Sequence, residues 1–317
     1  MRVLLCTIFL ALFPVSAGAQ TYPTKPVRLI VPFPPGGSND VVGRMIAAQL
    51  STRLDTPVIV ENQGGAGGLI GTEVAARAQP DGYTLLLVSV AYAFIPSIYK
   101  LSFDPATAFT PVAMLGSGPV VIAVTSKLEV DSIKELISLA KRNPGTLNYA
   151  TAGVGSFQHL ASELFKLQAG VDIVHVPFKG GGPAMMDVIA GNTQIAIGSL
   201  VQMLPQIKGG RLKALGVGSA SRIPALPDVP TVSEAGVPGY QVTNWWGIVA
   251  PAGTPRRVIE RLHNELNAIA TSAETKKRFE TEGAEPLSMS PDEFSRFIAA
   301  ETTKWARVVK DANIRAE

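Results

Sequence analysis

Apolar strand-like runs alternate with helical patterns from Val27 onward, and this alternation constrains the fold more than any other feature. The run "VRLIVPF" precedes "DVVGRMIAAQL", whose apolar residues recur every three or four positions, as in a helix with one buried face. The strand "TPVIVEN", the helix "GTEVAARAQ" and the strand "YTLLLVSV" follow. Strands that alternate with helices favour a mainly parallel sheet covered by helices. The sequence therefore predicts an α/β fold.

A second series of the same kind predicts a second lobe. It contains the strands "PVVIAVTS", "LNYAT", "VDIVHVPF" and "TQIAIGSL", separated by helical patterns. Two stretches resemble each other, because "VIAVTSKLEVDSIKELISLA" and "GIVAPAGTPRRVIERLHNEL" both run strand, turn and amphipathic helix. We expect two crossover strands that form a hinge, with lobe 1 spanning residues 20–120 and 245–317 and lobe 2 spanning residues 121–244. The alternative is one continuous sheet without lobes.

The first 19 residues are typical of a secretory signal peptide. An apolar run over residues 3–13 precedes Ala17-Gly18-Ala19, an A-x-A cleavage site before Gln20. The run is too short for a membrane anchor, which needs about 20 apolar residues. The single cysteine, Cys6, lies inside the run, so the mature chain would lack thiols for disulfides, catalysis or soft metals. We expect a protein free in the periplasm.

The composition indicates a globular protein whose partner is not a nucleic acid. The chain has 317 residues, 46% hydrophobic and 17% charged, and its formal net charge is only +3. This charge is too small and too scattered for a nucleic-acid-binding surface.

The stretch "VPFPPGGSND" joins the first strand to the first helix and has the features of an anion-binding loop. Gly36 and Gly37 let the backbone approach a ligand closely, and Ser38 is a good N-cap. The free amides and the positive dipole end of the helix favour a carboxylate or phosphate. The alternative is that glycine and serine serve only to turn the chain.

A second loop of this type, "YATAGVGSFQHL", follows a strand of the second series and ends in Ser156. Ligands of open α/β sheets bind at the carboxyl ends of strands. Two helix N-termini, one from each lobe, would therefore grip one small anion. A third turn, "PFKGGGPAMMD", offers Lys179 as a cation for the cleft or as plain surface, and Asp187 as a brace of the turn or a partner for a ligand amine.

The glycine cluster "ENQGGAGGLIG" matches no nucleotide motif. It lacks the lysine of a phosphate-binding loop, and Ile70 stands where a dinucleotide loop needs its last glycine. The sequence predicts that this cluster packs beside the first loop.

No catalytic or metal-binding constellation is present in the sequence, so we expect no enzyme activity and no cofactor. The three histidines are scattered, and Ser156 does not lie in a G-x-S-x-G elbow. His159 either contacts a ligand, supports Ser156, or is structural. In Asn244-Trp245-Trp246 the tryptophans either pack in the core and hinge, or one ring lines the cleft.

Four long stretches resemble the Bug family of periplasmic receptors for tripartite tricarboxylate transporters. They are "YPTKPVRLIVPFPPGGSND", "VIVENQGGAGGLIGTEVAARAQPDGYTLLL", "ATAGVGSFQHLASELF" and "RLKALGVGSASRIPALPDVPTVSEAGVPGY" with "WWGIVAPAGTP". The resemblance covers the mature chain in the same order. It implies a Venus-flytrap protein that binds a small carboxylate between two lobes and delivers it to membrane permease subunits, with no cofactor. We expect a monomer.

The resemblance also implies which residues bind the ligand. They are Phe33, Gly37, Ser38 and Asn39 in the first loop, Thr151, Gly153, Gly155, Ser156 and His159 in the second, and Ser89 and Ser199 at strand ends. Three positions depart from the family pattern. Asn39 replaces a common threonine, Pro35 a common alanine, and Phe178 the usual tyrosine. The family's contacts to the ligand carboxylate are therefore expected to apply to this chain better than its contacts to the rest of the ligand.

Two rival hypotheses remain at this stage. A sensory module would bind a ligand in the same cleft and present the liganded lobes to a signalling partner. An exported hydrolase would use Ser156 and His159 but needs a third group to orient the histidine.

Overall fold

The structure is a computed structural model that describes residues 22–315, so the predicted signal peptide lies outside the described residues. The strands are β1 (Val27–Val31), β2 (Val58–Asn62), β3 (Thr84–Ser89), β4 (Phe109–Thr125), β5 (Asn148–Thr151), β6 (Val174–Pro177), β7 (Ile195–Ser199), β8 (Leu212–Val217), β9 (Thr243–Pro251) and β10 (Glu285–Pro286). The helices are α1 (Ser38–Leu54), the 3-10 turn η1 (Ala66–Gly68), α2 (Leu69–Ala76), α3 (Val90–Ile98), α4 (Ile133–Arg142), α5 (Phe157–Ala169), α6 (Gly181–Ala190), α7 (Leu200–Lys208), α8 (Arg256–Ala270), α9 (Ala273–Glu282) and α10 (Pro291–Asp311).

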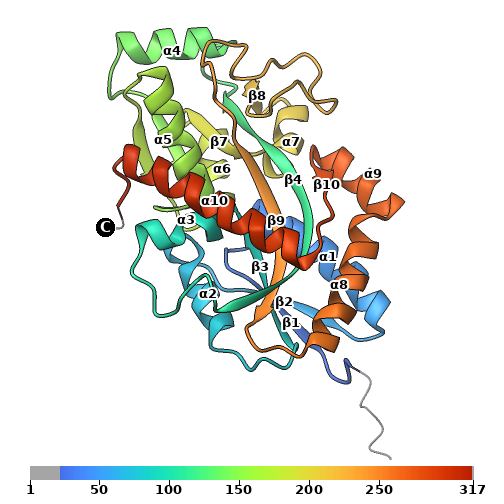
Figure 1. Ribbon diagram of the computed structural model, residues 1–317. Coiled ribbons are helices and arrows are strands. Elements are labelled where there is room, and N and C mark those ends of the chain that lie inside the picture. Colours follow the sequence, from blue (N-terminus) through green and yellow to red (C-terminus); the bar gives the residue numbers. More distant parts are fainter. Residues whose placement is uncertain (1–21, 316–317) are drawn as a thin grey trace, which may run out of the picture.

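The strand β4 belongs to both halves of the molecule because its partners change along its length. Residues 109–119 pair antiparallel with β9, and residues 120–125 pair antiparallel with β7 and β8. The strand order is β2-β1-β3-β9-β4-β7-β5-β6, with β8 and β10 also paired to β4. In Figure 1, β4 and β9 run lengthwise through the molecule and join its lower and upper parts. The sheet is thus continuous through β4, and the predicted α/β fold with two crossover strands is confirmed.

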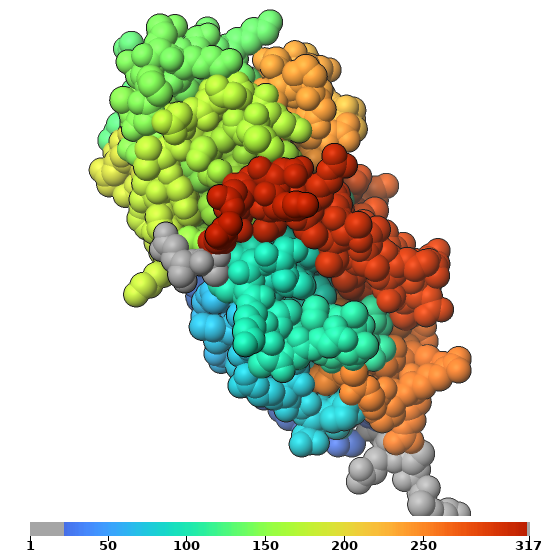
Figure 2. Space-filling model, turned by 60° about the vertical axis from the view of Figure 1, so that its left-hand side comes forward, coloured from blue at the N-terminus to red at the C-terminus, as the bar shows by residue number. Residues whose placement is uncertain are grey.

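The lower sheet is buried on both faces, which explains the apolar runs of its strands. Residues of β1 and β3 alternate between the faces. Val31 and Leu87 belong to the core beneath α1 and α8, whereas Ile30 and Leu86 belong to the core beneath α3 and α10. Figure 2 shows α10, in red, lying across the boundary between the lower and upper parts. The C-terminal helix therefore packs along the line where the two halves join.

The helices α3 and α7 were not predicted from the sequence. Both helices are nine residues long, and each contains a proline, Pro96 or Pro205. The first six residues of α3 are buried without a polar face, so the segment lacks the alternating pattern of an amphipathic helix. Each helix begins directly after the serine that ends a strand, at Ser89 or Ser199.

In residues 22–315, none of the helices is both long and apolar enough to span a membrane.

The crossover strand β9 contacts α10 so closely that Gly247 leaves no room for a side chain. A Cβ atom at this position would lie 2.2 Å from Cζ of the fully buried Phe294. We expect Gly247→Ala to lower the free energy of unfolding by about 1–3 kcal/mol, the usual cost of overpacking. Urea unfolding measures this change.

A second substitution tests the cause. Phe294→Leu shortens the opposing side chain, so the double variant should lose less stability than the sum of the two single variants. Strict additivity of the two changes would contradict this explanation.

Candidate functional site

At four junctions between a strand and the helix that follows it, a buried serine stands at or next to the start of the helix. The serines are Ser38, the first residue of α1, Ser89, the last residue of β3, Ser156, which precedes α5, and Ser199, the last residue of β7, all 9% exposed or less. The first amides of a helix have no partner within the helix, and its N-terminus carries a partial positive charge. The turns therefore concentrate hydrogen-bond donors at the carboxyl ends of both sets of parallel strands.

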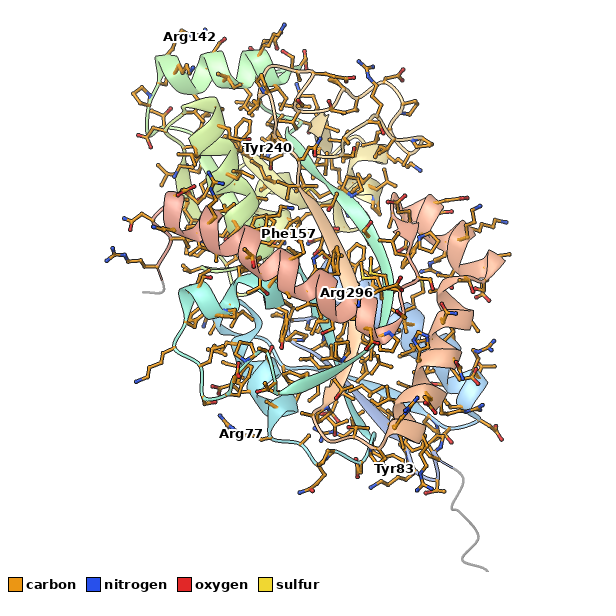
Figure 3. The ribbon with its side chains drawn as sticks, viewed as in Figure 1. Arg77, Tyr83, Arg142, Phe157, Tyr240 and Arg296 are labelled. Carbon is orange, nitrogen blue, oxygen red and sulfur yellow. The ribbon has the colours of Figure 1, made fainter. Side chains whose placement is uncertain are left out.

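Residues of three of these junctions line one small cavity, the inner cavity. Its lining residues are Phe33, Pro34, Gly37, Ser38, Asn39, Ser89, Ala152, Phe157, Gln158, Gly181 and Asn244. Its volume is about 20 Å³, and a water molecule needs at least about 10–15 Å³ of such space. Phe157, the first residue of α5, lies between the lower and upper parts of the molecule in Figure 3. Both parts therefore contribute to the inner cavity.

The prediction that Ser38 caps α1 was wrong. The N-cap is Gly37, and Ser38 is the first helical residue. The carboxylate of Asp40 reaches back instead and accepts the N–H of Gly36 at 3.1 Å. The Ser38 hydroxyl is therefore free to face the inner cavity, where Asn244 Nδ2 lies 3.5 Å from it.

The buried carboxylate of Asp40 is neutralised by its own partners. Arg44 forms an ion pair with it at 3.0 Å, and Asn62 Nδ2 donates to it at 2.9 Å. Burial raises the pKa of Asp40, but the hydrogen bonds from Arg44, Gly36 and Asn62 outweigh burial and hold this pKa below its usual value. The negative charge of Asp40 beside the first turn is thus balanced locally.

None of the predicted residues of the second loop lines the inner cavity, and only Gly153 lines a cavity at all, the outer one described below. Ser156 accepts the backbone N–H of His159 at 3.3 Å and caps α5, as its position predicted. The ring of His159 accepts the N–H of Gly155 at Nδ1, also at 3.3 Å. Thr151 Oγ1 lies 2.6 Å from Nε2 of His175 and accepts the Gly153 N–H at 3.1 Å. These contacts shape the loop.

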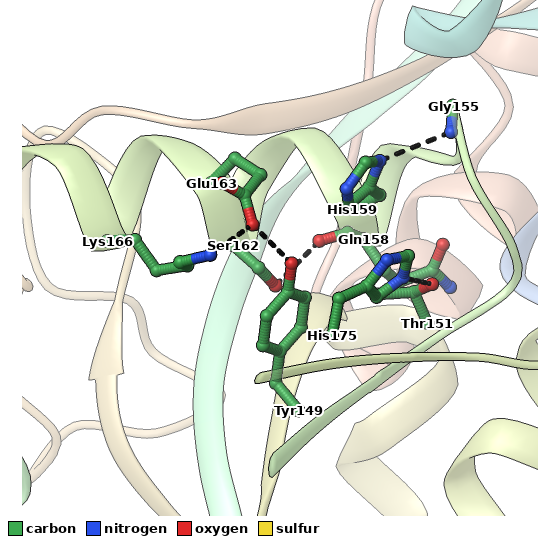
Figure 4. A network of polar contacts seen from close by, with 9 residues as sticks. All are labelled: Tyr149, Thr151, Gly155, Gln158, His159, Ser162, Glu163, Lys166 and His175. Atoms are coloured by element: carbon green, nitrogen blue, oxygen red, sulfur yellow. Dashed lines mark hydrogen bonds and ion pairs between the residues drawn. The ribbon is translucent and has the colours of Figure 1, made fainter. Parts of the chain in front are cut away.

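The ring of His159 belongs to a stacked network (Figure 4). Its centroid lies 4.2 Å from that of His175, which stacks in turn on Tyr149. Tyr149 donates to Glu163, and Lys166 forms an ion pair with Glu163 at 2.8 Å. Burial lowers the pKa of His159, which favours the neutral ring that the Gly155 hydrogen bond requires.

A larger outer cavity of about 490 Å³ adjoins the inner one, because Phe33, Pro34 and Ala152 line both. It also contains the predicted residues Gly153 and Lys179. Its remaining walls are Gly64, Gly65, Ala66, Gly67, Gly68, Tyr99, Val154, Phe178 and Gly180. The sequence analysis did not assign the cluster at 64–68 to a ligand site, because its spacing matches no known motif.

The loops of the lower and upper parts touch across the outer cavity. A Cβ atom on Gly67 would lie 2.6 Å from the carbonyl oxygen of Gly155. The Tyr99 hydroxyl donates to the carbonyl of Val154 at 3.0 Å. These contacts join the loops of the two parts beside the cavities.

Besides Thr151, Gly155, Ser156 and His159 of the second loop, two further predicted site residues line neither cavity. Asp187 accepts hydrogen bonds from the Asn192 side chain and from both the N–H and the hydroxyl of Thr193, so it braces the turn after α6. Ser199 is 1% exposed, and its hydroxyl has no hydrogen-bond partner among the described residues.

Both tryptophans of β9 are buried, so their rings pack in the core.

Comparisons with known proteins identify the family. A sequence model of the tripartite tricarboxylate transporter family receptor matches residues 42–314. Protein BugT of Bordetella pertussis is 39% identical over 317 residues, which cover 97% of this chain and 96% of BugT.

Solved structures agree with this assignment. Rpa4515 of R. palustris with adipate has a TM-score of 0.90 at 36% identity, covering 93% of this chain and 100% of that one. MatC (Rpa3494) of Rhodopseudomonas palustris with bound malate has a TM-score of 0.86 at 32% identity, covering 91% and 100%. The periplasmic binding protein BugD has a TM-score of 0.89 at 35% identity, covering 93% and 100%. This chain therefore belongs to the Bug family of tripartite tricarboxylate transporter receptors, which are periplasmic solute-binding proteins with a two-lobed fold.

Proposed function

We propose that this protein binds one small carboxylate in the two adjoining cavities and delivers it to the membrane permease subunits of a tripartite tricarboxylate transporter. The observation that carries this proposal is the inner cavity, lined by the first residues of α1 and α5 and by Ser89 before α3. The structures of Rpa4515 with adipate and MatC with malate support a carboxylate ligand. Export through a signal peptide at residues 1–19 and action as a monomer in the periplasm complete the proposal.

The ligand is captured by closure of two lobes in this proposal. Lobe 1 comprises residues 20–120 and 245–317, and lobe 2 comprises residues 121–244. The change of partners along β4 between residues 119 and 120 supports these boundaries. Closure excludes water from the inner cavity and so strengthens each hydrogen bond to the anion.

The direct contacts in this proposal come from the residues that line the cavities. Ser38 and Ser89 bind the carboxylate in the inner cavity, and Phe33, Gly37 and Asn39 line it. The second-loop residues act mainly by holding the backbone of that loop. Lys179 is exposed at the outer cavity and attracts the far end of an anionic ligand.

We propose no catalytic role for Ser156 and His159. The Ser156 hydroxyl is fully buried and caps α5, and the His159 ring is bonded to Gly155. This arrangement disfavours the hydrolase hypothesis, since a nucleophile needs the histidine ring as its base. A sensory role would use the same cleft, and capture of either permease subunits or a signalling partner by the liganded protein distinguishes the two.

Ligand binding by the mature protein tests the proposal directly. We expect one class among aliphatic dicarboxylates, tricarboxylates, acidic amino acids and aromatic acids to stabilise it by about 2.7 kcal/mol at 100 times the dissociation constant. Ser38→Leu fills the inner cavity and should weaken binding of that ligand at least about 100-fold in titration calorimetry, which is about 2.8 kcal/mol.

The matched control is Ser138→Leu, at an exposed position of α4. It should leave the affinity unchanged. If none of the carboxylates stabilised the protein, or if Ser38→Leu bound the ligand with normal affinity, the proposed site would be refuted.

Closure is tested at the contact between Gly67 and Gly155. We expect Gly67→Ala to weaken ligand binding about tenfold, or about 1.4 kcal/mol, because the added methyl group meets the Gly155 carbonyl. Gly170→Ala is the control, since its φ of 61° matches the 62° of Gly67 and a Cβ there has nothing within 4 Å. Both variants carry the same left-handed backbone cost. Equal affinities of the two variants would argue against closure.

The stability of the second loop should depend on pH through His159. Its pKa is lowered in the folded state, so the unfolded chain binds more protons as the pH falls below about 6.5. The contribution of the neutral ring is therefore complete above about pH 6.5 and is lost at lower pH. His159→Gln keeps an acceptor for Gly155 without titrating. Urea unfolding between pH 7.5 and 5.5 should show a flatter profile for this variant, whereas identical profiles would contradict the assignment.

A further inference from the structure

The crossover strand β9 sends alternate side chains to opposite sides, as strand geometry requires. Trp245 packs against Phe294 and Phe297 of α10, and its Nε1 donates to Glu301 at 3.1 Å. The neighbouring Trp246 faces the other way. Its Nε1 donates to Oδ1 of Asn39 in the first turn of α1 at 2.9 Å. Two adjacent, fully buried tryptophans thus have separate hydrogen-bond partners, and one of these partners lines the inner cavity.

The bond from Trp246 fixes the orientation of the Asn39 amide group. An indole N–H can only donate, so the side of the amide that faces Trp246 must be the oxygen. The amide nitrogen of Asn39 then points toward Ser89, and Nδ2 donates to Ser89 Oγ at 3.3 Å. All three side chains are at least nine-tenths buried, so water competes little for these bonds.

The orientation of Asn39 in turn decides what Ser89 offers to a ligand. A serine hydroxyl has one hydrogen to donate and can also accept. Ser89 accepts from Asn39, and its side chain makes no capping bond to α3. Its hydrogen is therefore left for the inner cavity, which Ser89 lines. A reversed Asn39 amide would take this hydrogen and leave only lone pairs facing the cavity, which repel a carboxylate.

We propose that Trp246 is a positioning residue that, through Asn39, makes the Ser89 hydroxyl a donor and thereby selects a negatively charged acceptor over a neutral donor group in the inner cavity. This inference rests on the proposed function for the contact between Ser89 and the ligand. The crossover strand β9 thus determines that Ser89 offers the ligand a hydrogen-bond donor, although Trp246 itself does not contact the ligand.

Two tryptophan variants form a matched test. Trp246→Phe and Trp245→Phe each remove one indole N–H from a fully buried ring of β9. The probe is the carboxylate that stabilises the wild-type protein in the panel, together with the same compound bearing a neutral carboxamide in place of each carboxylate. Trp246→Phe should weaken carboxylate binding about tenfold and reduce the ratio of carboxylate to carboxamide affinity. Trp245→Phe should change neither quantity, although both variants lower Tm.

A double variant with Ser89→Ala shows whether Trp246→Phe weakens binding by misorienting the Ser89 hydroxyl or by loosening the protein in general. In a Ser89→Ala background, Trp246→Phe should alter carboxylate affinity less than twofold, because the hydroxyl that it orients is gone. Equal weakening of carboxylate and carboxamide, or a full effect in the Ser89→Ala background, would overturn the proposal. If Trp246→Phe does not fold, Asn39→Leu removes the same link and should reduce the same affinity ratio.

A measurement without ligand keeps this inference separate from the proposed function. The side-chain amide NMR signals of Asn39 should shift in Trp246→Phe and stay in place in Trp245→Phe. Absence of binding to every carboxylate would refute the proposed function, whereas unshifted Asn39 signals in Trp246→Phe would refute the positioning role.

Discussion

The backbone hydrogen bonds of β4 are the interaction on which the rest of this structure depends. Because one half of the strand pairs with β9 and the other half with β7 and β8, a single element orients two sets of parallel strands. The carboxyl ends of β1 and β3 then face those of β5 and β7, and the turns that follow these strands converge. A cavity lined from both lobes is a consequence of this pairing, since neither set of turns encloses it alone.

In the proposed function, the inner cavity binds an anion although it has no cation among its lining residues. Its donors are hydroxyl groups, amide side chains and the first amides of helices, held in place by the fold before a ligand arrives. Hydrogen bonds to a charged acceptor are about twice as strong as those between neutral groups. The Asp40 carboxylate lies in this region, and Arg44 balances its charge. A small net charge of +3 is therefore compatible with anion binding.

The sequence predicted those parts of the fold and site that depend on local patterns. Glycine and serine after an apolar run marked the turns at Ser38 and Ser156, and the paired strand and helix units marked both crossovers. It did not predict α3 and α7, because Pro96 and Pro205 interrupt both segments and the first six residues of α3 have no polar face. The cap at Gly37 was missed because Asp40, rather than Ser38, satisfies the preceding amide.

Contacts between distant segments could not be read from the sequence. The approach of Gly67 to Gly155 joins loops from different lobes, and nothing in the spacing of either loop indicates it. The bond from Trp246 to Asn39 depends on which face of β9 meets α1, and this follows only from the register of β9 against β3. The sequence analysis left open whether the tryptophans pack in the core or line the cleft. The structure puts both rings in the core, and it links the nitrogen of Trp246 to the cleft through Asn39.

We expect the two cavities to have different roles in ligand binding. The inner cavity is built from main-chain groups and short side chains whose positions the fold fixes, so its preference for a carboxylate is hard to change. The outer cavity offers few polar side chains to a ligand, because the Tyr99 hydroxyl is bonded to Val154 and Phe178 carries no hydroxyl. The exposed Lys179 adds little binding energy, since solvent screens charges at a surface. We therefore expect the inner cavity to supply most of the affinity, and the shape of the outer cavity to decide which carboxylates are accepted.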